Sequence, residues 1–137
     1  KISTREDLST KFTNLGYQFL TLIHPRAYVS PSARVEDGAQ IMAGAIVQAE
    51  SNIGSLSVIN SGAIIEHNCC IGDHAHIAPG AILCGGVQAG SGVFVGAGAV
   101  VLQNLKLKAY STLAAGVTLR RNLLRKEVFY GHSHESR

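Results

Sequence analysis

The sequence predicts an all-β protein built as a parallel β-solenoid, in which short strands and tight turns repeat along one axis. An aliphatic residue (Val, Ile, Leu or Ala) occupies every sixth position from Val29 to Leu119 without exception. Glycine recurs three positions after many of these residues, as at Gly38 and Gly44, and a small residue usually follows at the fourth. A helix requires a spacing near 3.6 residues and a simple strand a spacing of about two, so neither explains a period of six.

Each six-residue unit is interpreted as a short strand plus a turn, with one large side chain directed inward and a small one in the corner. The glycine before the corner can adopt the positive φ that a tight turn requires. Three units complete one triangular coil of about 18 residues, and coils stack about 4.8 Å apart. The ninety-odd residues of the repeat therefore predict about five coils. A β-sandwich of short strands is the alternative, and the periodicity disfavours it.

The composition fits uniform stacking of aliphatic side chains. The chain has 137 residues, the length of one domain, of which 46% are hydrophobic but only 6% aromatic. Charged residues make up 15%, against about 25% in an average protein, which argues against disorder and against a highly solvated monomer. The net charge of +3 is too weak to indicate a nucleic-acid-binding protein.

Two further classes of protein, membrane-spanning and secreted, are disfavoured. Apolar runs are far shorter than the roughly 20 residues of a membrane span, and no signal-peptide pattern opens the chain. Three cysteines, an odd number without framework spacing, fit a reducing compartment, so we expect a cytoplasmic protein.

The ends of the chain differ from the repeat. Residues 1–23 break the period and are interpreted as an N-terminal remnant or cap: Thr4 with Asp7 indicates a helix start, and Tyr17 to Ile23 a strand. The solenoid is expected over residues 24–131, with a closing strand near Val128 to Tyr130. Residues 132–137 are expected to form a flexible tail.

An 18-residue coil sorts the outward side chains onto three faces. The first is mainly apolar (Tyr28, Ile46, Ile64, Ile82, Val100), the second polar (Arg34, Asn52, Cys70, Gln88, Lys106) and the third largely apolar (Gln40, Val58, His76, Phe94, Thr112). Two apolar outer faces on a thin prism predict contact surfaces, because such large exposed patches are unusual on monomers. We therefore expect a homotrimer in which the first face of one copy packs on the third face of the next.

Two histidines stand out in this arrangement. His67 occupies a turn position at the edge between the first and second faces, and His76 begins the third face. In the expected trimer they face each other across an interface, in a crevice that also receives Asn60, Glu66, Cys84, Gly85 and Gly86. An imidazole with a pKa near ~6.5 can take a proton from an amine or hydroxyl that attacks a thioester. Glycines leave room there for a narrow pantetheine arm, so the crevice suits acyl transfer.

The segments IHPRAYVSPSA and IIEHNCCIGDHAHIAPGAILCGGV resemble the hexapeptide-repeat acyltransferases, over roughly residues 24–131. Within that family they look most like the C-terminal domain of the sialic acid O-acetyltransferase and UDP-4-amino-sugar N-acetyltransferase branch. The resemblance implies a left-handed β-helix, a homotrimer with active sites at subunit interfaces, and acetyl-CoA as co-substrate. It also implies a small-molecule acceptor, a nucleotide-activated amino sugar for bacterial surface glycans, acetylated on an amino or hydroxyl group.

The resemblance also implies roles for individual residues. The catalytic base falls on His67, the second histidine near the acetyl group on His76, and the cofactor contact on Gly85, with Gly86 beside it. Asn60 and Glu66 match polar residues that line the pocket. The family usually has an acidic residue directly after the base, where this chain has Asn68. Either Glu66 substitutes as the group that orients the imidazole, or the base is weaker.

A second departure concerns residues 1–23, which resemble only the tail of the family's N-terminal nucleotide-sugar-binding domain. The alternative to an enzyme is therefore a non-catalytic trimeric scaffold, or a cofactor-binding fragment without the acceptor domain. No metal is expected, because His67, His74 and His76 lack the spacing of the zinc ligands in related β-helix carbonic anhydrases. His74 is interpreted as solvated and Cys84 as a packing residue. A C-terminal basic group either meets coenzyme A phosphates or is simply solvated (Arg120, Arg121, Arg125, Lys126).

Overall fold

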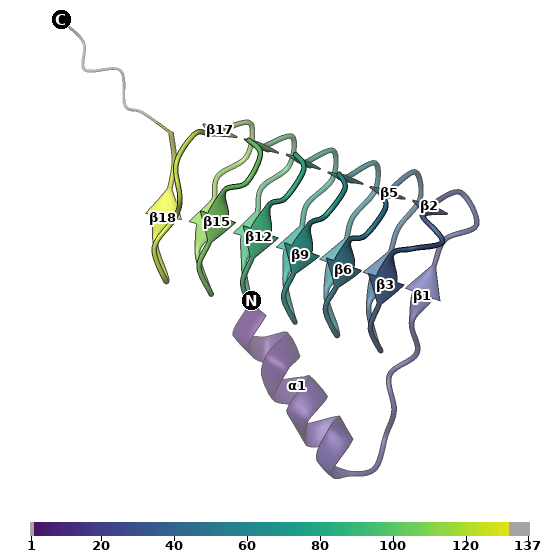
Figure 1. Cartoon of the computed structure of the whole chain (residues 1–137). Coiled ribbons are helices and arrows are strands. Elements are labelled where there is room, and N and C mark those ends of the chain that lie inside the picture. Colours follow the sequence, from purple (N-terminus) through teal and green to yellow (C-terminus); the bar gives the residue numbers. More distant parts are fainter. Residues whose placement is uncertain (1, 132–137) are drawn as a thin grey trace, which may run out of the picture.

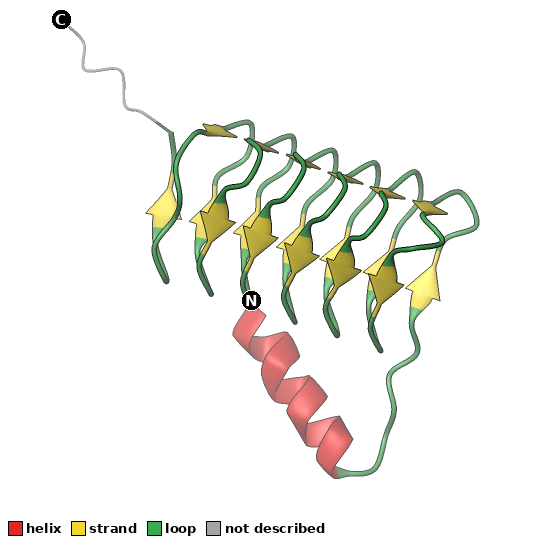
Figure 2. Cartoon of the chain, in the orientation of Figure 1, coloured by secondary structure: helices red, strands yellow, loops and turns green. Residues whose placement is uncertain are grey.

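The structure is a computed structural model that describes residues 2–131. One helix, α1 (Ile2–Asn14), precedes a solenoid of about six turns, whose two-residue strands form three parallel sheets of six, five and seven strands. Figure 1 shows the coils stacked along one axis, and Figure 2 shows that turns and loops make up most of each coil. The all-β, left-handed β-helix class is confirmed.

The three sheets correspond to the three predicted faces. The first sheet comprises β2 (Tyr28–Val29), β5 (Ile46–Val47), β8 (Ile64–Ile65), β11 (Ile82–Leu83), β14 (Val100–Val101) and β17 (Thr118–Leu119). The second comprises β3 (Arg34–Val35), β6 (Asn52–Ile53), β9 (Cys70–Ile71), β12 (Gln88–Ala89) and β15 (Lys106–Leu107). The third comprises β1 (Leu22–Ile23), β4 (Gln40–Ile41), β7 (Val58–Ile59), β10 (His76–Ile77), β13 (Phe94–Val95), β16 (Thr112–Leu113) and β18 (Val128–Phe129).

The six-residue period accounts for the core. In the coils of the repeat the second residue of each strand points inward; Ile41, Ile59 and Leu83 are at most 1% exposed. Up to β17, strands pair in register with the strand three later, as His76 does with Phe94, which gives the expected coil of 18 residues. Backbone hydrogen bonds and stacked aliphatic side chains thus hold neighbouring coils together, as in other solenoids.

The turns follow the predicted glycine pattern. Every glycine three positions after an inward aliphatic residue has a positive φ (Gly38, Gly44, Gly62, Gly80, Gly86, Gly92, Gly98, Gly116). Where the repeat lacks glycine there, other residues take the same conformation, including Asn68 (φ 58°) and Asn104 (φ 60°). Asparagine tolerates this left-handed region better than most residues, so both fit the slot with little strain.

The N-terminal segment differs from the prediction in two ways. The helix begins at Ile2, so Thr4 and Asp7 lie inside it and neither caps its start. The strand is only β1, Leu22–Ile23, because pairing with β4 reaches no further back. Before it, the Thr21 hydroxyl donates to the Glu36 carbonyl (3.1 Å) and accepts from the Gly38 amide (3.2 Å), so it joins this segment to the next coil.

Helix α1 packs beside the edge between the second and third sheets. A cavity of about 290 Å³ lies between them, lined by residues of the helix, the following loop and the first coils, among them Arg5, Gln40, Leu56 and His74. His74 is therefore half-buried, with its Nδ1 atom buried and without a hydrogen-bond partner in the described part of the chain. The interpretation of His74 as a solvated residue is wrong, because sequence alone did not place the helix over it.

At the other end the predicted closing strand is confirmed as β18, Val128–Phe129, which pairs with β16. The expected flexible tail, 132–137, lies outside the described residues. Within residues 2–131 no helix has the length and hydrophobicity that crossing a membrane requires.

Candidate functional site

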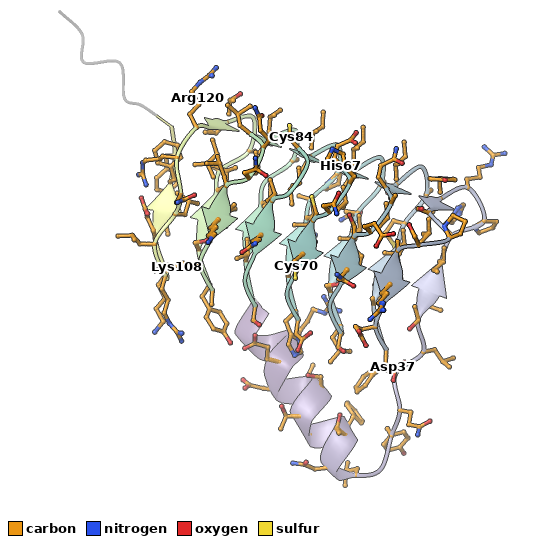
Figure 3. All side chains as sticks on the ribbon, in the orientation of Figure 1. Asp37, His67, Cys70, Cys84, Lys108 and Arg120 are labelled. Carbon is orange, nitrogen blue, oxygen red and sulfur yellow. The ribbon has the colours of Figure 1, made fainter. Side chains whose placement is uncertain are left out.

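The turns that join the first sheet to the second form one edge of the prism, and His67 lies on it. Figure 3 shows His67, Cys84 and Arg120 along this edge, on successive parts of the solenoid. His67 and Asn68 are exposed, whereas Glu66 and Cys84 beside them are half-buried. The His67 carbonyl accepts the Gly86 amide of the next coil (2.9 Å), so the backbone under the imidazole is held firmly.

The imidazole of His67 is oriented by its neighbour in sequence. Its Nδ1 atom lies 2.9 Å from the side-chain Oδ1 of Asn68. The left-handed conformation of Asn68 brings the two adjacent side chains together. Nε2, the other ring nitrogen, has no hydrogen-bond partner among residues 2–131.

The absence of a side chain at Gly85, on the next coil, leaves space for the His67 ring. A Cβ atom at Gly85 would lie 2.6 Å from His67 Nε2, and one at Gly86 would overlap the side-chain oxygen of Asn104. Both glycines therefore make room for side chains of this chain itself.

Glu66 stands beside the histidine without bonding to it. The backbone carbonyl of Glu66 accepts the Ser51 hydroxyl (2.7 Å), and its carboxylate makes no hydrogen bond or ion pair within the described residues. Glu66 therefore does not orient the ring; Asn68 does, through its side-chain oxygen. Sequence reasoning missed this bond, although the position of Asn68 in the positive-φ slot was a signal for it.

His76 and Asn60 come together on the third sheet. Asn60 Nδ2 lies 3.3 Å from His76 Nε2, and Asn60 Oδ1 accepts the Ser61 amide (2.8 Å), which directs the Nδ2 donor toward the ring. Phe94 packs edge-on against the imidazole with 5.3 Å between ring centroids. Burial, and secondarily the positive charge of Arg5, lowers the pKa of His76 below its usual value. The ring is therefore neutral near pH 7, with Nε2 as an acceptor.

Within one chain these two groups do not form one site. His67, Glu66, Gly85 and Gly86 belong to the edge between the first and second sheets, whereas His76 belongs to the third sheet. A site that contains both histidines therefore requires a second copy of the chain.

The remaining candidates have structural partners. Burial raises the pKa of the Cys69 thiol to about 11, and the Cys69 Sγ donates to the Cys84 carbonyl (3.2 Å). Cys69 and Cys84 are therefore packing residues.

Among the described residues no three His, Cys, Asp or Glu side chains lie close enough to hold a metal ion.

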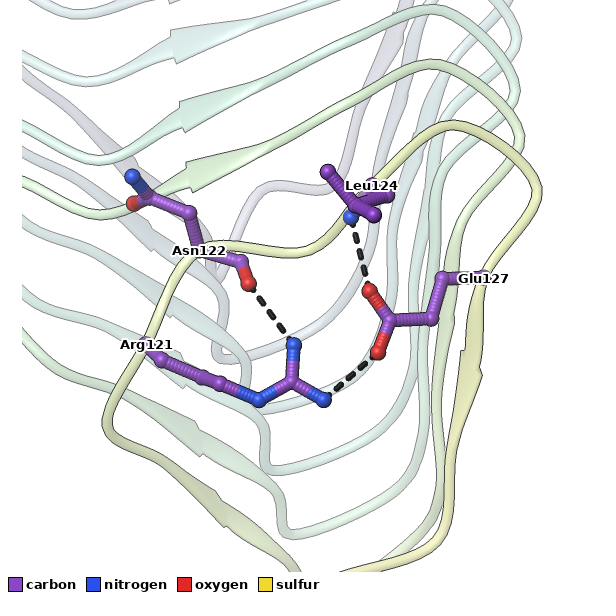
Figure 4. Close-up of polar contacts among 4 residues, drawn as sticks. All are labelled: Arg121, Asn122, Leu124 and Glu127. Carbon is purple, nitrogen blue, oxygen red and sulfur yellow. Dashed lines mark hydrogen bonds and ion pairs between the residues drawn. The ribbon is translucent and has the colours of Figure 1, made fainter.

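Most of the basic residues near the C-terminal end form contacts that hold the last coil closed. Arg121 forms an ion pair with Glu127 (2.6 Å), donates to the Asn122 carbonyl (3.0 Å) and lies over the Phe129 ring; Figure 4 shows the polar contacts. Arg125 stacks over Tyr110, 5.6 Å from the ring centroid. Arg120 is exposed and has none of these contacts.

Comparison with known proteins gives several close structural matches. PerB of Caulobacter crescentus, solved with CoA and GDP-perosamine, superimposes with a TM-score of 0.90 at 36% identity over 92% of this chain and 61% of that one. The acetyltransferase domain of PglB from Neisseria gonorrhoeae FA1090 superimposes with a TM-score of 0.90 at 31% identity over 93% and 62%. WeeI from Acinetobacter baumannii AYE, at 20% identity and a TM-score of 0.89 over 93% and 62%, supports the fold alone.

The chain thus spans about three-fifths of the length of the structures that it matches. No protein-family model matches the sequence, and neither does any curated protein sequence. The structural neighbours are hexapeptide-repeat β-helix acetyltransferases. In fold and repeat, the chain is a hexapeptide-repeat left-handed β-helix of the kind found in these acetyltransferases.

Proposed function

We propose that the chain is the acetyl-transfer part of an enzyme that moves an acetyl group from acetyl-CoA to an amino or hydroxyl group of a sugar nucleotide. One observation carries the proposal: an exposed imidazole, His67, is held through Nδ1 by a side-chain oxygen and has a free Nε2. That is the arrangement of a general base, which needs a fixed ring and an unoccupied acceptor nitrogen.

The reaction is a direct transfer. The acceptor nitrogen or oxygen attacks the thioester carbonyl carbon of acetyl-CoA while His67 Nε2 takes its proton. The tetrahedral intermediate then loses the CoA thiolate as the carbon–sulfur bond breaks, and the imidazolium returns the proton to sulfur. No acyl-enzyme forms, and a neutral His76 near the acetyl group supplies a hydrogen-bonding partner for the intermediate.

Two of the similar structures support the choice of substrates. PerB was solved with CoA and GDP-perosamine, and the PglB acetyltransferase domain with acetyl-CoA (33% identity, TM-score 0.86, over 89% of this chain and 60% of that one). We therefore propose a nucleotide-linked amino sugar for bacterial surface glycans as acceptor. The chain's free cysteines fit the reducing cytoplasm, where we place the protein.

The site is proposed to be complete only in a homotrimer, where His76 and Asn60 of a second copy lie opposite His67. The first sheet supports this, because its outer face is a row of half-buried isoleucine and valine side chains, including Ile46, Ile64 and Ile82. An apolar row of this kind is unusual on a monomer.

Ile64→Asp should therefore break the trimer, because a carboxylate in the middle of a packed apolar interface is strongly disfavoured. Light scattering should give the mass of three chains for the unaltered protein and a lower mass for the variant. Gln88→Asp, which adds the same charge to the exposed second sheet, should leave the mass unchanged. A monomeric unaltered protein would contradict the interface assignment.

The activity is tested by release of free thiol from acetyl-CoA, with GDP-perosamine as the acceptor and without any acceptor. We expect thiol release that depends on the sugar. Binding of CoA without sugar-dependent thiol release would favour the alternative, a cofactor-binding scaffold.

A further inference from the structure

The side chain of Asn68 is the one group that forms a hydrogen bond with the His67 ring within residues 2–131, through the 2.9 Å contact between Oδ1 and Nδ1. An amide oxygen can only accept a hydrogen bond, so this contact requires the proton of the neutral imidazole to lie on Nδ1. The lone pair is then on Nε2, which lies beside Gly85 of the next coil. If the amide were turned, its NH₂ would donate to Nδ1 and the proton would move to Nε2, which would abolish the base.

The contact is electrically neutral, which distinguishes it from a carboxylate–histidine pair. A carboxylate on Nδ1 stabilises the imidazolium and raises the pKa of the ring, whereas an amide orients the ring without adding charge. Titratable groups near the ring include Glu66 before it, and Cys69 and Cys70 after Asn68. On the adjoining coils, Glu50 is in register with Asn68 one coil earlier and Cys84 with Glu66 one coil later. None of them forms a hydrogen bond or ion pair with the imidazole in the described part of the chain.

We propose that Asn68 is a neutral positioning residue, which selects the Nε2 lone pair of His67 as the proton acceptor without adding a charge beside the ring. The inference rests on the proposed role of His67 in acetyl transfer. Its consequence is that a neutral oxygen, rather than a carboxylate, orients the ring. Asparagine fits at position 68 because it tolerates the left-handed backbone conformation that the turn requires there.

The proposal is tested by ¹⁵N NMR of the histidine rings in the full chain. Above its titration midpoint, His67 should be the Nδ1–H tautomer. Asn68→Asp, which keeps the shape and adds a charge, should raise the midpoint by about one pH unit or more. The acid limb of the pH dependence of kcat/KM should move upward by the same amount.

Asn68→Gly removes the oxygen while providing the residue that the repeat most often places in this slot. We expect the tautomer preference to be lost and kcat to fall about tenfold with KM nearly unchanged, as after loss of one hydrogen bond. The matched control is Asn104→Asp, because Asn104 occupies the same slot two coils further along with the same backbone conformation (φ 60°). It should leave the His67 midpoint unchanged.

An Nε2–H tautomer in the unaltered protein would overturn the proposal, as would equal midpoint shifts in Asn68→Asp and Asn104→Asp. The NMR results do not depend on turnover. The expected tautomer together with absent thiol release would therefore contradict the proposed function and leave the orientation by Asn68 intact.

Discussion

His67→Ala should lower kcat for acetyl transfer by roughly 10²–10⁴-fold, the usual contribution of a positioned general base. The KM for acetyl-CoA should change little, because proton transfer occurs in the transition state and the exposed ring does not hold the cofactor in the ground state. The measurement is sugar-dependent thiol release at saturating acetyl-CoA. Circular dichroism should show the unaltered β-helix, since the side chain lies outside the core.

His24→Ala is the matched control for this variant. His24 is also exposed and also uses Nδ1 in a local contact, accepting the Arg26 amide (3.0 Å), but it lies away from the edge that carries His67. Its kcat should match that of the unaltered chain. Retention of full activity in His67→Ala would remove the assignment of this residue as the base.

Gly72→Ala should destabilise the fold by about 3 kcal/mol, the upper part of the range for overpacking. A Cβ atom at Gly72 would lie 2.5 Å from the Ser91 nitrogen and 2.6 Å from the Gly90 carbonyl carbon. Both atoms are backbone of the next coil, which stacking holds in place, so the strain cannot be relieved by moving a side chain. The free energy of unfolding in urea, compared at equal protein concentration, measures the effect.

Gly62→Ala separates this crowding from the cost of the backbone conformation. Gly62 has a φ of +65°, and a Cβ atom there would have no other atom within 4 Å, so alanine should cost only about 1–2 kcal/mol. If Gly72→Ala and Gly62→Ala lost the same free energy of unfolding, crowding between the backbones of successive coils would not account for the effect at Gly72.

The fold could be predicted from the sequence because every coil of a solenoid has the same geometry, which appears in the sequence as a regular period. Positions such as Ile59 and Leu83 recur at a fixed spacing, and each coil contacts only its neighbours, so local pattern determines long-range structure. The same pattern sorted the three faces and identified the positive-φ turns. Pairing at the ends extended the stack to about six turns, where the repeat alone predicted about five.

The N-terminal segment could not be predicted in the same way, because it lies outside the period. The limits of β1 depend on its partner β4, and the burial of His74 depends on where α1 packs. Both are tertiary contacts between segments without a shared repeat, so propensity and capping signals placed them only approximately.

The candidate site was partly predictable for a related reason. The positions of His67 and His76 follow from the period, because an 18-residue coil places every residue on a face or an edge. The contacts that define their chemistry are side-chain conformations. The bond from Asn68 to His67, the bond from Asn60 to His76 and the space left by Gly85 are visible only in three dimensions.

The most direct test of the central claim, that the edge carrying His67 is the site of acetyl transfer, is a crystal structure of the chain with CoA bound. We expect a trimer in which the CoA sulfur lies at this edge, between His67 of one copy and the third sheet of the next. CoA bound elsewhere on the protein, with this edge exposed to solvent, would contradict the account.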